Sequence, residues 1–523
     1  MQCDEAAAVP RTAIDGLLYD EQRIGLVGRG DAHREPRPDR LQLLPDGVDP
    51  LAELNKANAV FRLIYWAVVL AALLLLAAAP LSVRAASDWI CARPEYAPMP
   101  VPDAALEPLY STWYGYHQDV HDVDLEREFA EAAALGMKTL IVDDGWQTED
   151  TGRGYAYCGD WEPALSRFPD FRAHVERVHA LGLKYMIWYS VPFVGMKSRA
   201  AKRFEGRFLG PAGNMGAWVL DPRFPEVRKF LVDTYVAAMK EWGLDGFKLD
   251  FIDSFRFNGK DPAVAEDYAG RDIRSLPDAV NRLMMDVYAA LSAENPDVLI
   301  EFRQKYIGPA IRQFGNMMRA TDCPGDMQLN RQRIANLRLT SGGAAVHADM
   351  LEWHPTDTPE GAALPILSSM FGVIQYSMML RDLPESHREV IRHWLAFSQR
   401  HRDTLLKGRF RAYHPEAQYP LLEAESEAER IIGVYAAGQV VPCGAFDRTV
   451  YVLNGVSGDS AVLDFADGTA TAEVFDAAGK AAGTVKLCRG VQRVAVPRSG
   501  YLRIVPPADY CLCKRFGDGE VQP

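Results

Sequence analysis

Short apolar runs and amphipathic stretches alternate along most of this 523-residue chain. Eight of the runs have the length and content of buried strands, and they occupy residues 109–115, 138–146, 184–190, 246–251, 298–303, 316–322, 344–350 and 373–379. Stretches with helical spacing separate most of them, at residues 123–135, 171–181, 225–242, 278–294, 326–340, 361–371 and 385–406. Eight strands with helical stretches between most of them, in roughly 300 residues, predict an α/β fold, a (β/α)8 barrel over residues 109–408.

A different pattern begins after the barrel. From about Phe410, short runs such as RIIGVYAAG and TVYVLNG are separated by Gly, Asp and Ser. This spacing predicts a C-terminal all-β sandwich over residues 409–505, followed by a tail at 506–523. Before the barrel, we expect residues 86–108 to be a linker.

The first 85 residues differ from the rest of the chain. Residues 1–58 are polar, and we expect them to be disordered or a mis-assigned extension. Leu63 to Ala79 are then apolar throughout and are followed by small residues. This arrangement predicts a signal peptide at 59–85, cleaved after Ala85, and therefore a periplasmic or extracellular protein. An uncleaved membrane anchor is the alternative, because the 17 apolar residues approach the about 20 that span a bilayer.

The overall charge narrows the classes of partner. Lys and Arg number 57 against 70 Asp and Glu, which gives a net charge of −13. Nucleic acid binding needs a concentrated basic surface, so we expect no nucleic acid partner. The eight cysteines include no CxxC pair, and we expect neither a metal nor an organic cofactor.

Two of the predicted strands carry carboxylates at their ends. The run GFKLDF contains Asp250, and the run NMMRATD ends at Asp322. Barrel enzymes place their reactive groups at the C-terminal ends of strands, and two carboxylates there suit the cleavage of a glycosidic bond. Lys248 lies two residues before Asp250, so both side chains point to the same side of the strand. The Lys248 ammonium then favours an ionised, nucleophilic carboxylate.

Other strand ends contribute acids, cations and aromatic side chains to the same predicted rim. These candidates are Trp113, Asp143, Asp144, Trp146, Trp188, Glu301, Arg303, His347 and Asp349. Buried acids need partners, so packing alone does not explain such a set. A metal-dependent hydrolase is an alternative, with candidate ligands His117, His121, His347 and Asp349, although these histidines lack the usual spacing of zinc ligands. Cys158 and Cys323 flank the predicted site, and a disulfide between them is a further hypothesis.

Several strings around these residues are more specific together than any one is alone. They are VDDGW, CGDWEP with FPDF, WGLDGFKLDF, MRATDCPGD and HADMLEWH. Between about Leu109 and Leu405, this set resembles the melibiase-type α-galactosidases of glycoside hydrolase family 36, which share a clan with family 27. The resemblance implies a catalytic (β/α)8 barrel followed by a β-sandwich, with no cofactor.

The resemblance also implies roles for individual residues. Asp250 matches the nucleophile of the family, and Asp322 matches its general acid/base. Matches to sugar-binding positions are Asp143 and Asp144 for the C4 and C6 hydroxyls, Lys248 for hydroxyls beside the nucleophile, Trp161 on the substrate loop, and Arg303 after the fifth strand. We also expect five further residues at the substrate site, namely Trp113, Trp146, Trp188, His347 and Asp349.

These inferences predict a retaining exo-glycosidase that removes terminal α-D-galactosyl residues from a carbohydrate substrate by double displacement. Asp322 would protonate the leaving oxygen while Asp250 attacks, and water activated by Asp322 would then release the sugar. The segment EFRQKYIGP replaces the Cys/Gly-rich segment that reads the C2 substituent in the family. An α-N-acetylgalactosaminidase and a β-L-arabinopyranosidase are therefore alternatives, as are a transglycosylase and an inactive carbohydrate-binding barrel.

Overall fold

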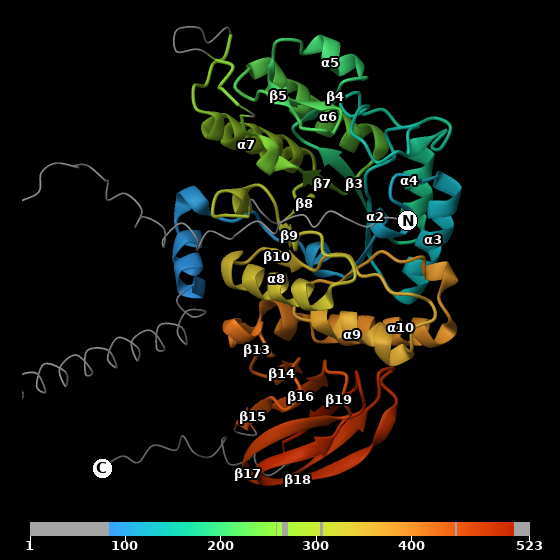
Figure 1. Ribbon diagram of the computed structural model, residues 1–523, viewed down its shortest axis with the longest axis vertical. Helices are drawn as coiled ribbons and strands as arrows, with labels where there is room; N and C mark the ends of the chain where they lie inside the picture. The colour runs from blue at the N-terminus through green and yellow to red at the C-terminus, as the bar shows by residue number, and fades with distance from the viewer. Residues whose placement is uncertain (1–82, 258, 264–269, 304–306, 445–446, 507–523) are drawn as a thin grey trace, which may run out of the picture. The chain divides into compact units, whose positions relative to one another are not determined.

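The computed structural model describes residues 83–506, apart from residues 258, 264–269, 304–306 and 445–446 (Figure 1). The predicted extension at 1–58, nearly all of the predicted signal segment at 59–85 and most of the tail at 506–523 lie outside the described residues. Among the helices that are described, none is long and apolar enough to cross a membrane.

Eight parallel strands form a barrel in the spatial order β10-β9-β8-β7-β3-β2-β1-β11. They are β1 (Leu109–Ser111), β2 (Thr139–Val142), β3 (Lys184–Ser190), β7 (Gly246–Asp250), β8 (Leu299–Arg303), β9 (Met317–Arg319), β10 (Ala345–His347) and β11 (Gln375–Tyr376). The sheet closes where His347 bridges Val373, just before β11, which in turn pairs with β1. The predicted (β/α)8 barrel is therefore confirmed.

Helices lie between most of the successive barrel strands. They are α2 (Trp113–Tyr116), α3 (Asp122–Leu135), α4 (Phe171–Ala180), α6 (Pro225–Trp242), α7 (Leu276–Glu294), α8 (Met327–Thr340), α9 (Pro359–Ser369) and α10 (Glu385–Arg400). In α6, buried Val227, Leu231 and Tyr235 are four residues apart and form one apolar face. This helix ends at Gly243, whose φ of 73° suits a left-handed C-terminal cap. The helix expected at 385–406 changes after α10 into a π-helical turn, η7 (Asp403–Lys407).

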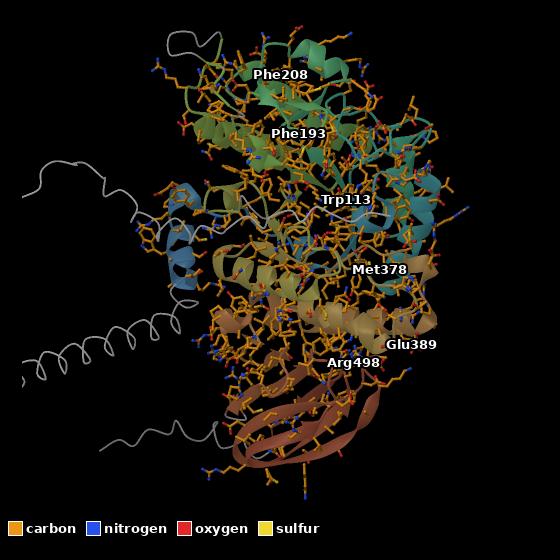
Figure 2. All side chains as sticks on the ribbon, viewed as in Figure 1. Trp113, Phe193, Phe208, Met378, Glu389 and Arg498 are labelled. Atoms are coloured by element: carbon orange, nitrogen blue, oxygen red, sulfur yellow. The ribbon has the colours of Figure 1, made fainter. Side chains whose placement is uncertain are left out.

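The stretch between β3 and α6, for which the sequence pattern predicted no strand, contains a small antiparallel sheet. Its strands β4 (Phe193–Gly195), β5 (Phe208–Pro211) and β6 (Ala217–Leu220) pair in the order β4-β6-β5, beside α5 (Arg199–Arg203). The Phe208 and Trp218 rings stack with centroids 5.4 Å apart, and Phe193 and Phe208 lie above Trp113 in the view of Figure 2. Strands of three or four residues are too short for a period of two to be visible in the sequence.

The segment before β1 is packed against the barrel. Residues 83–91 form a helix, and two 3₁₀ turns follow, η2 (Pro94–Tyr96) and η3 (Asp103–Leu106). Ser87 Oγ donates a hydrogen bond to the Thr340 carbonyl at 3.0 Å and accepts one from Arg312 Nη1 at 2.8 Å. Residues 86–108, expected as a linker, therefore include structure that is fixed to the barrel.

The C-terminal residues form an all-β domain, as predicted. Its strands are hydrogen-bonded in the order β12 (Arg409–Tyr413), β13 (Leu421–Glu425), β14 (Glu429–Val434), β16 (Thr449–Asn454), β19 (Tyr501–Ile504), β17 (Ser460–Phe475) and β15 (Val440–Gly444), with β18 (Ala481–Ala495) paired to β17. Val452, Leu463 and Leu502 belong to its own apolar core. Trp394 of α10 donates its indole N–H to the Ala477 carbonyl at 2.9 Å, which ties this domain to the barrel.

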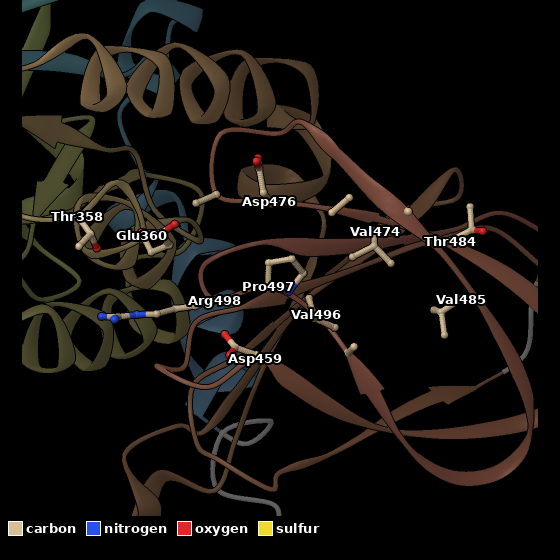
Figure 3. A pocket seen from close by; sticks show the side chains of 14 residues that line it. Thr358, Glu360, Asp459, Val474, Asp476, Thr484, Val485, Val496, Pro497 and Arg498 are labelled. Carbon is tan, nitrogen blue, oxygen red and sulfur yellow. The ribbon is translucent and has the colours of Figure 1, made fainter.

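A cavity of about 720 Å³ lies where α9 meets the C-terminal domain (Figure 3). Thr358 and Glu360, at the start of α9, line one part of it, and Asp476, Val496 and Arg498 line another. None of the residues predicted to perform chemistry lines this cavity, so it is distinct from the predicted site.

Candidate active site

A second, small cavity of about 80 Å³ lies at the carboxyl ends of the barrel strands. Ten residues line it, namely Trp113, Asp143, Asp144, Tyr155, Trp188, Lys248, Asp250, Phe251, Arg303 and Asp322. Eight of these were expected at the site from the sequence, and the structure brings them together from six different strand ends. Charged and aromatic side chains make up the whole lining, which suits a ligand with both polar edges and apolar faces.

Asp250 ends β7 and is buried in the wall of this cavity. Its Oδ1 accepts hydrogen bonds from the Phe251 N–H at 2.7 Å and from Arg303 Nε at 2.8 Å, whereas Oδ2 accepts one from Trp188 Nε1 at 3.3 Å. Burial by itself raises the pKa of Asp250, but the nearby charges of Arg303 and Lys248 bring it below its ordinary value. Asp250 is therefore ionised, and Oδ2 is its less strongly held oxygen.

The backbone at Phe251 contributes to this arrangement. Phe251 has a φ of 64°, in the left-handed region that residues other than glycine rarely adopt. In this conformation its N–H donates to Asp250, and its ring lies 5.3 Å from Tyr155 and 4.8 Å from Phe193, between centroids. Strained backbone of this kind persists where the surrounding packing enforces it, commonly at functional sites.

Lys248 and Asp143 form a buried ion pair beside Asp250. The Lys248 ammonium is 2.5 Å from Asp143 Oδ2, and the two side chains are only 4% and 3% exposed. Asp143 is also fixed through its backbone N–H, which donates to Thr112 Oγ1, and through Oδ1, which accepts the Asp144 N–H, both at 2.9 Å. Removing either charge would leave the other buried without a partner, so the pair is a rigid polar element of the cavity.

Asp144, the neighbour of Asp143, is held by two amide side chains. Its two oxygens accept hydrogen bonds from Gln118 Nε2 at 2.6 Å and from Gln147 Nε2 at 2.7 Å. Burial nevertheless raises the pKa of Asp144 to about 7. At neutral pH this group is close to half protonated, so it can donate as well as accept a hydrogen bond.

Asp322 is the more exposed of the two proposed catalytic carboxylates, with 46% of its side chain accessible. Arg319 Nη2 donates to its Oδ1 at 2.9 Å, while Nη1 of the same guanidinium pairs with Asp349 and Nε lies 3.4 Å from Glu301 Oε1. Burial raises the pKa of Asp322, but Arg319 and Lys248 lower it well below its ordinary value. One buried guanidinium thus connects Asp322 to two carboxylates inside the barrel.

Four residues predicted at the substrate site do not line the cavity, namely Trp146, Trp161, His347 and Asp349. Trp146 and Trp161 are buried with ring centroids 6.1 Å apart, and the Trp146 indole N–H donates to the Trp188 carbonyl at 2.9 Å. His347 Nε2 contacts the Ala105 carbonyl at 2.8 Å inside the barrel. Because their hydrogen bonds and packing are already made within the fold, these residues support the lining rather than form it.

Sequence reasoning did not identify Tyr155, Phe251 and Arg319 as parts of the site. Arg319 has a detectable signal, because a lone arginine in the apolar run NMMRATD must find buried partners when the strand forms. The only sequence signal for Phe251 is its position directly after Asp250. Tyr155 comes from an irregular segment between β2 and α4, and its ring reaches Trp188 at 6.0 Å between centroids, a contact with no local sequence signal.

The proposed disulfide between Cys158 and Cys323 is absent, since both are free thiols. Cys158 follows β2 and lies 3.9 Å from Gln147 Nε2, whereas Cys323 follows β9 and donates its backbone N–H to Asp349. In the barrel order β9 is separated from β2 by β8, β7 and β3. The two cysteines flank the cavity from different sides, so the hypothesis was wrong.

The histidines of the metal-site alternative do not converge. His117 Nδ1 contacts the Trp113 carbonyl at 2.6 Å, and His347 is bonded to Ala105. Within the part of the chain that the structure describes, no group of three or more His, Cys, Asp or Glu side chains is placed to hold a metal ion. The described geometry gives this alternative no support.

Residues 104–305 match the family model described as Melibiase. A probable α-galactosidase G of Aspergillus terreus is 28% identical over 207 residues, which cover 37% of this chain and 27% of the relative. A protein of Flavonifractor plautii, described as A type blood alpha-D-galactosamine galactosaminidase, is 23% identical over 349 residues, covering 60% of this chain and 28% of the relative. The chain thus spans less than a third of the length of these curated relatives.

A solved structure with the same fold is that of the GH36 α-galactosidase AgaA from Geobacillus stearothermophilus. It has a TM-score of 0.55 and 15% identity, and the match covers 78% of this chain and 56% of that chain. The residues matched by the family model include Asp143, Asp144, Lys248, Asp250 and Arg303, so most of the cavity lies in the matched segment. This chain therefore carries a melibiase domain at residues 104–305, within a barrel that has the same fold as GH36 α-galactosidase structures.

Proposed function

We propose that this protein is a retaining exo-glycosidase that hydrolyses terminal α-D-galactosyl residues. The observation that carries the proposal is one small cavity with two unlike carboxylates, Asp250 buried beside Arg303 and Asp322 half exposed. A retaining glycosidase needs one carboxylate that attacks the sugar carbon and another that exchanges a proton with the leaving group and with water. The melibiase match supports galactose as the sugar, and variants of AgaA are described in complex with stachyose and with raffinose.

Asp250 would attack the anomeric carbon through Oδ2. Oδ1 is engaged by the Phe251 N–H and by Arg303, which fixes the plane of the carboxylate, whereas the contact of Oδ2 with Trp188 is longer. A bond from Oδ2 to the sugar carbon forms as the bond to the leaving oxygen breaks, and a glycosyl-enzyme ester results. Arg303 and Lys248, which hold the pKa of Asp250 down, also make it a stable leaving group in the second step.

Asp322 would move the proton in both steps. Its ionised form, favoured by Arg319, is the one that accepts a proton from water when the glycosyl-enzyme is hydrolysed. The first step needs the protonated form, so substrate binding must raise the pKa of Asp322. A bound sugar does this by excluding water from the half-exposed carboxylate, because desolvation disfavours its charged form.

The remaining polar groups would bind the sugar hydroxyls. Asp143 and Lys248 offer an acceptor and a donor in fixed positions, and Asp144 can do either near neutral pH. Trp113 and Trp188 add aromatic surface for the apolar face of a pyranose ring. The cavity measures only about 80 Å³, so the interior units of a sugar chain have no room in it.

The description of the Flavonifractor plautii relative suggests α-D-galactosaminides as a second possible class of substrate. The C2 group of a sugar adjoins the carbon that Asp250 attacks, so it would lie near Arg303, which contacts Asp250 at 2.8 Å. The guanidinium would repel the ammonium group of galactosamine. A neutral galactoside is therefore the preferred substrate in this proposal.

A panel of nitrophenyl glycosides tests the proposed function. The purified protein should release nitrophenol from the α-galactoside faster than from the α-galactosaminide, the α-N-acetylgalactosaminide or the β-L-arabinopyranoside. Proton NMR of the first product should show α-galactose, because two inversions restore the configuration. Release of β-galactose would contradict the double displacement, and preference for another member of the panel would change the sugar while keeping the site.

We also propose that residues 59–85 direct export as a signal peptide, with a membrane anchor as the alternative. The apolar block from Leu63 to Ala79 and the small residues around Ala85 support this assignment. Sequencing the N-terminus of the native protein should give a chain that starts at Ala86. Recovery of a peptide from residues 1–58 in the native protein would contradict cleavage after Ala85.

A further inference from the structure

A third cavity, of about 290 Å³, lies next to Asp322. Cys323, the residue after Asp322, lines this cavity. Glu352 and Trp353, from the segment after β10, also line it. Asp322 lines the small cavity and Cys323 lines this one, so consecutive residues, with Cα atoms about 3.8 Å apart, contribute to the two linings. Its volume is close to the lower end of the range for small-molecule sites, about 300 Å³.

The barrel order places this third cavity on the side of Asp322 and away from Asp250. The segments that line it follow β9 and β10, whereas Asp250 ends β7, and β8 lies between β7 and β9. Asp349 fixes the relative positions, because it pairs with Arg319, which holds Asp322, and accepts the Cys323 N–H at 2.5 Å. A general acid protonates the oxygen of the leaving group, so that group must lie on the side of Asp322.

The lining of the third cavity offers hydrogen-bond acceptors and one aromatic ring, and its twelve residues include no Lys, Arg or His. Glu352 is exposed. Asp326 and Asp357 each accept a backbone N–H, from Leu329 at 2.9 Å and from His354 at 3.3 Å, and retain further acceptor positions. These carboxylates can accept hydrogen bonds from the hydroxyl groups of a ligand.

Trp353 supplies a fixed apolar surface in the same cavity. Its indole N–H donates to His387 Nδ1 at 3.2 Å, and its ring lies edge-on to Tyr376 with centroids 6.4 Å apart. Because these contacts already fix the indole, a ligand that packs on its free face costs little further side-chain entropy. Hydroxyl donors on the edges and C–H groups on the faces are the features of a neutral pyranose that such a cavity would bind.

We propose that this third cavity is the subsite for the leaving group and that it takes a neutral saccharide unit. The proposal rests on the proposed function, since Asp322 defines the leaving-group side only if it is the general acid/base. The substrate is then a galactosyl saccharide whose second sugar contacts Trp353 and Glu352, and not a free-standing galactoside of a small alcohol.

Two substrates with the same galactosyl group separate this subsite from the reacting groups. Melibiose carries glucose as its leaving group, whereas α-galactosyl fluoride carries one atom and has no group to place in the third cavity. Trp353→Ala should lower kcat/KM for melibiose by about tenfold, because the aromatic contact is lost. Its kcat/KM for α-galactosyl fluoride should stay within about twofold of that of the unmodified protein. Glu352→Gln should lower kcat/KM for melibiose by about threefold and leave kcat/KM for the fluoride unchanged.

Two control variants make the result interpretable. Trp353→Phe should recover most of the melibiose activity, because a ring remains, and Glu241→Gln, an exposed change on α6, should alter neither substrate. Equal losses on melibiose and the fluoride, or no loss on either, would overturn the subsite. If Trp353→Ala fails to fold, the Glu352→Gln variant still tests the subsite, because Glu352 is exposed. Failure of the unmodified protein to hydrolyse both substrates would instead overturn the proposed function, and the subsite with it.

Discussion

Replacing Asp250 with alanine is expected to lower kcat/KM for α-galactosides by roughly 10⁴-fold, because the carboxylate that bonds to the sugar carbon is lost. The fold should survive this change, since Lys248 keeps its partner Asp143 and Arg303 remains partly accessible at 12%. Steady-state hydrolysis of the nitrophenyl α-galactoside measures the loss. Asp253→Ala, an exposed change three residues further along, is the matched control and should retain full activity.

Azide distinguishes the role of Asp250 from that of Asp322. In Asp250→Ala, the Phe251 N–H and the Arg303 guanidinium remain as donors for a small anion in the vacated position. Azide should therefore attack the nitrophenyl substrate there, expel nitrophenolate and yield β-galactosyl azide. In Asp322→Ala it should instead attack the glycosyl-enzyme and yield the α-azide. Formation of the α-azide by Asp250→Ala would reverse the two assignments, and more than a tenth of the original activity in Asp250→Ala would remove it as the nucleophile.

The carboxylates of the site were predictable because regular structure places them. A strand alternates its side chains and ends where its apolar run ends, so Asp250 and Lys248 share a side and lie at the rim. The barrel then collects strand ends in one place, which is why Asp143 and Asp322 meet although they are 179 positions apart in the chain. Helix bounds were predictable for a similar reason, as with Pro225–Trp242, whose ends carry proline and glycine signals.

Side-chain direction in irregular segments was not predictable. Trp146 and Trp161 stand in the strings that resemble the family, yet both turn into the core, where Trp146 reaches the Trp188 carbonyl. Trp161 has a φ of 53°, a conformation that depends on its surroundings and not on a local pattern. Asp349 lies near the end of a strand, as Asp250 does, but it is fully buried and paired with the Arg319 guanidinium inside the barrel. Such outcomes depend on contacts between distant segments, which alternation and spacing do not specify.

Replacing Arg319 with leucine is expected to destabilise the protein by about 3–5 kcal/mol near pH 8. Arg319 is fully buried and pairs with Asp349 and Glu301, which are themselves fully buried, and with Asp322. Leucine fills part of the space but leaves the first two carboxylates without a cation. Urea denaturation at fixed pH gives the free energy of unfolding for the variant and for the unmodified protein.

The loss of stability should depend on pH in a defined direction. Burial already raises the pKa of Glu301 and of Asp349, while Arg319 opposes that shift, so removing Arg319 raises both pKa values further. A carboxyl group with a raised folded-state pKa destabilises the fold once the pH exceeds its unfolded value, near 4, because the unfolded chain then releases a proton that the fold retains. The difference between variant and unmodified protein should therefore be small near pH 4 and grow towards pH 8.

The same substitution should change catalysis through Asp322. Arg319 is the nearest cation that lowers the pKa of Asp322, so its loss should raise that pKa and keep the general acid protonated to higher pH. The alkaline limb of the pH–rate profile should move upwards in Arg319→Leu, whereas Arg319→Lys, which keeps the charge but not the fork that joins two carboxylates, should move it less. Arg282→Leu, which breaks only an exposed pair with Asp286, should change neither stability nor profile. A profile that stays in place while stability falls would show that Arg319 holds the barrel together without setting the ionisation of Asp322.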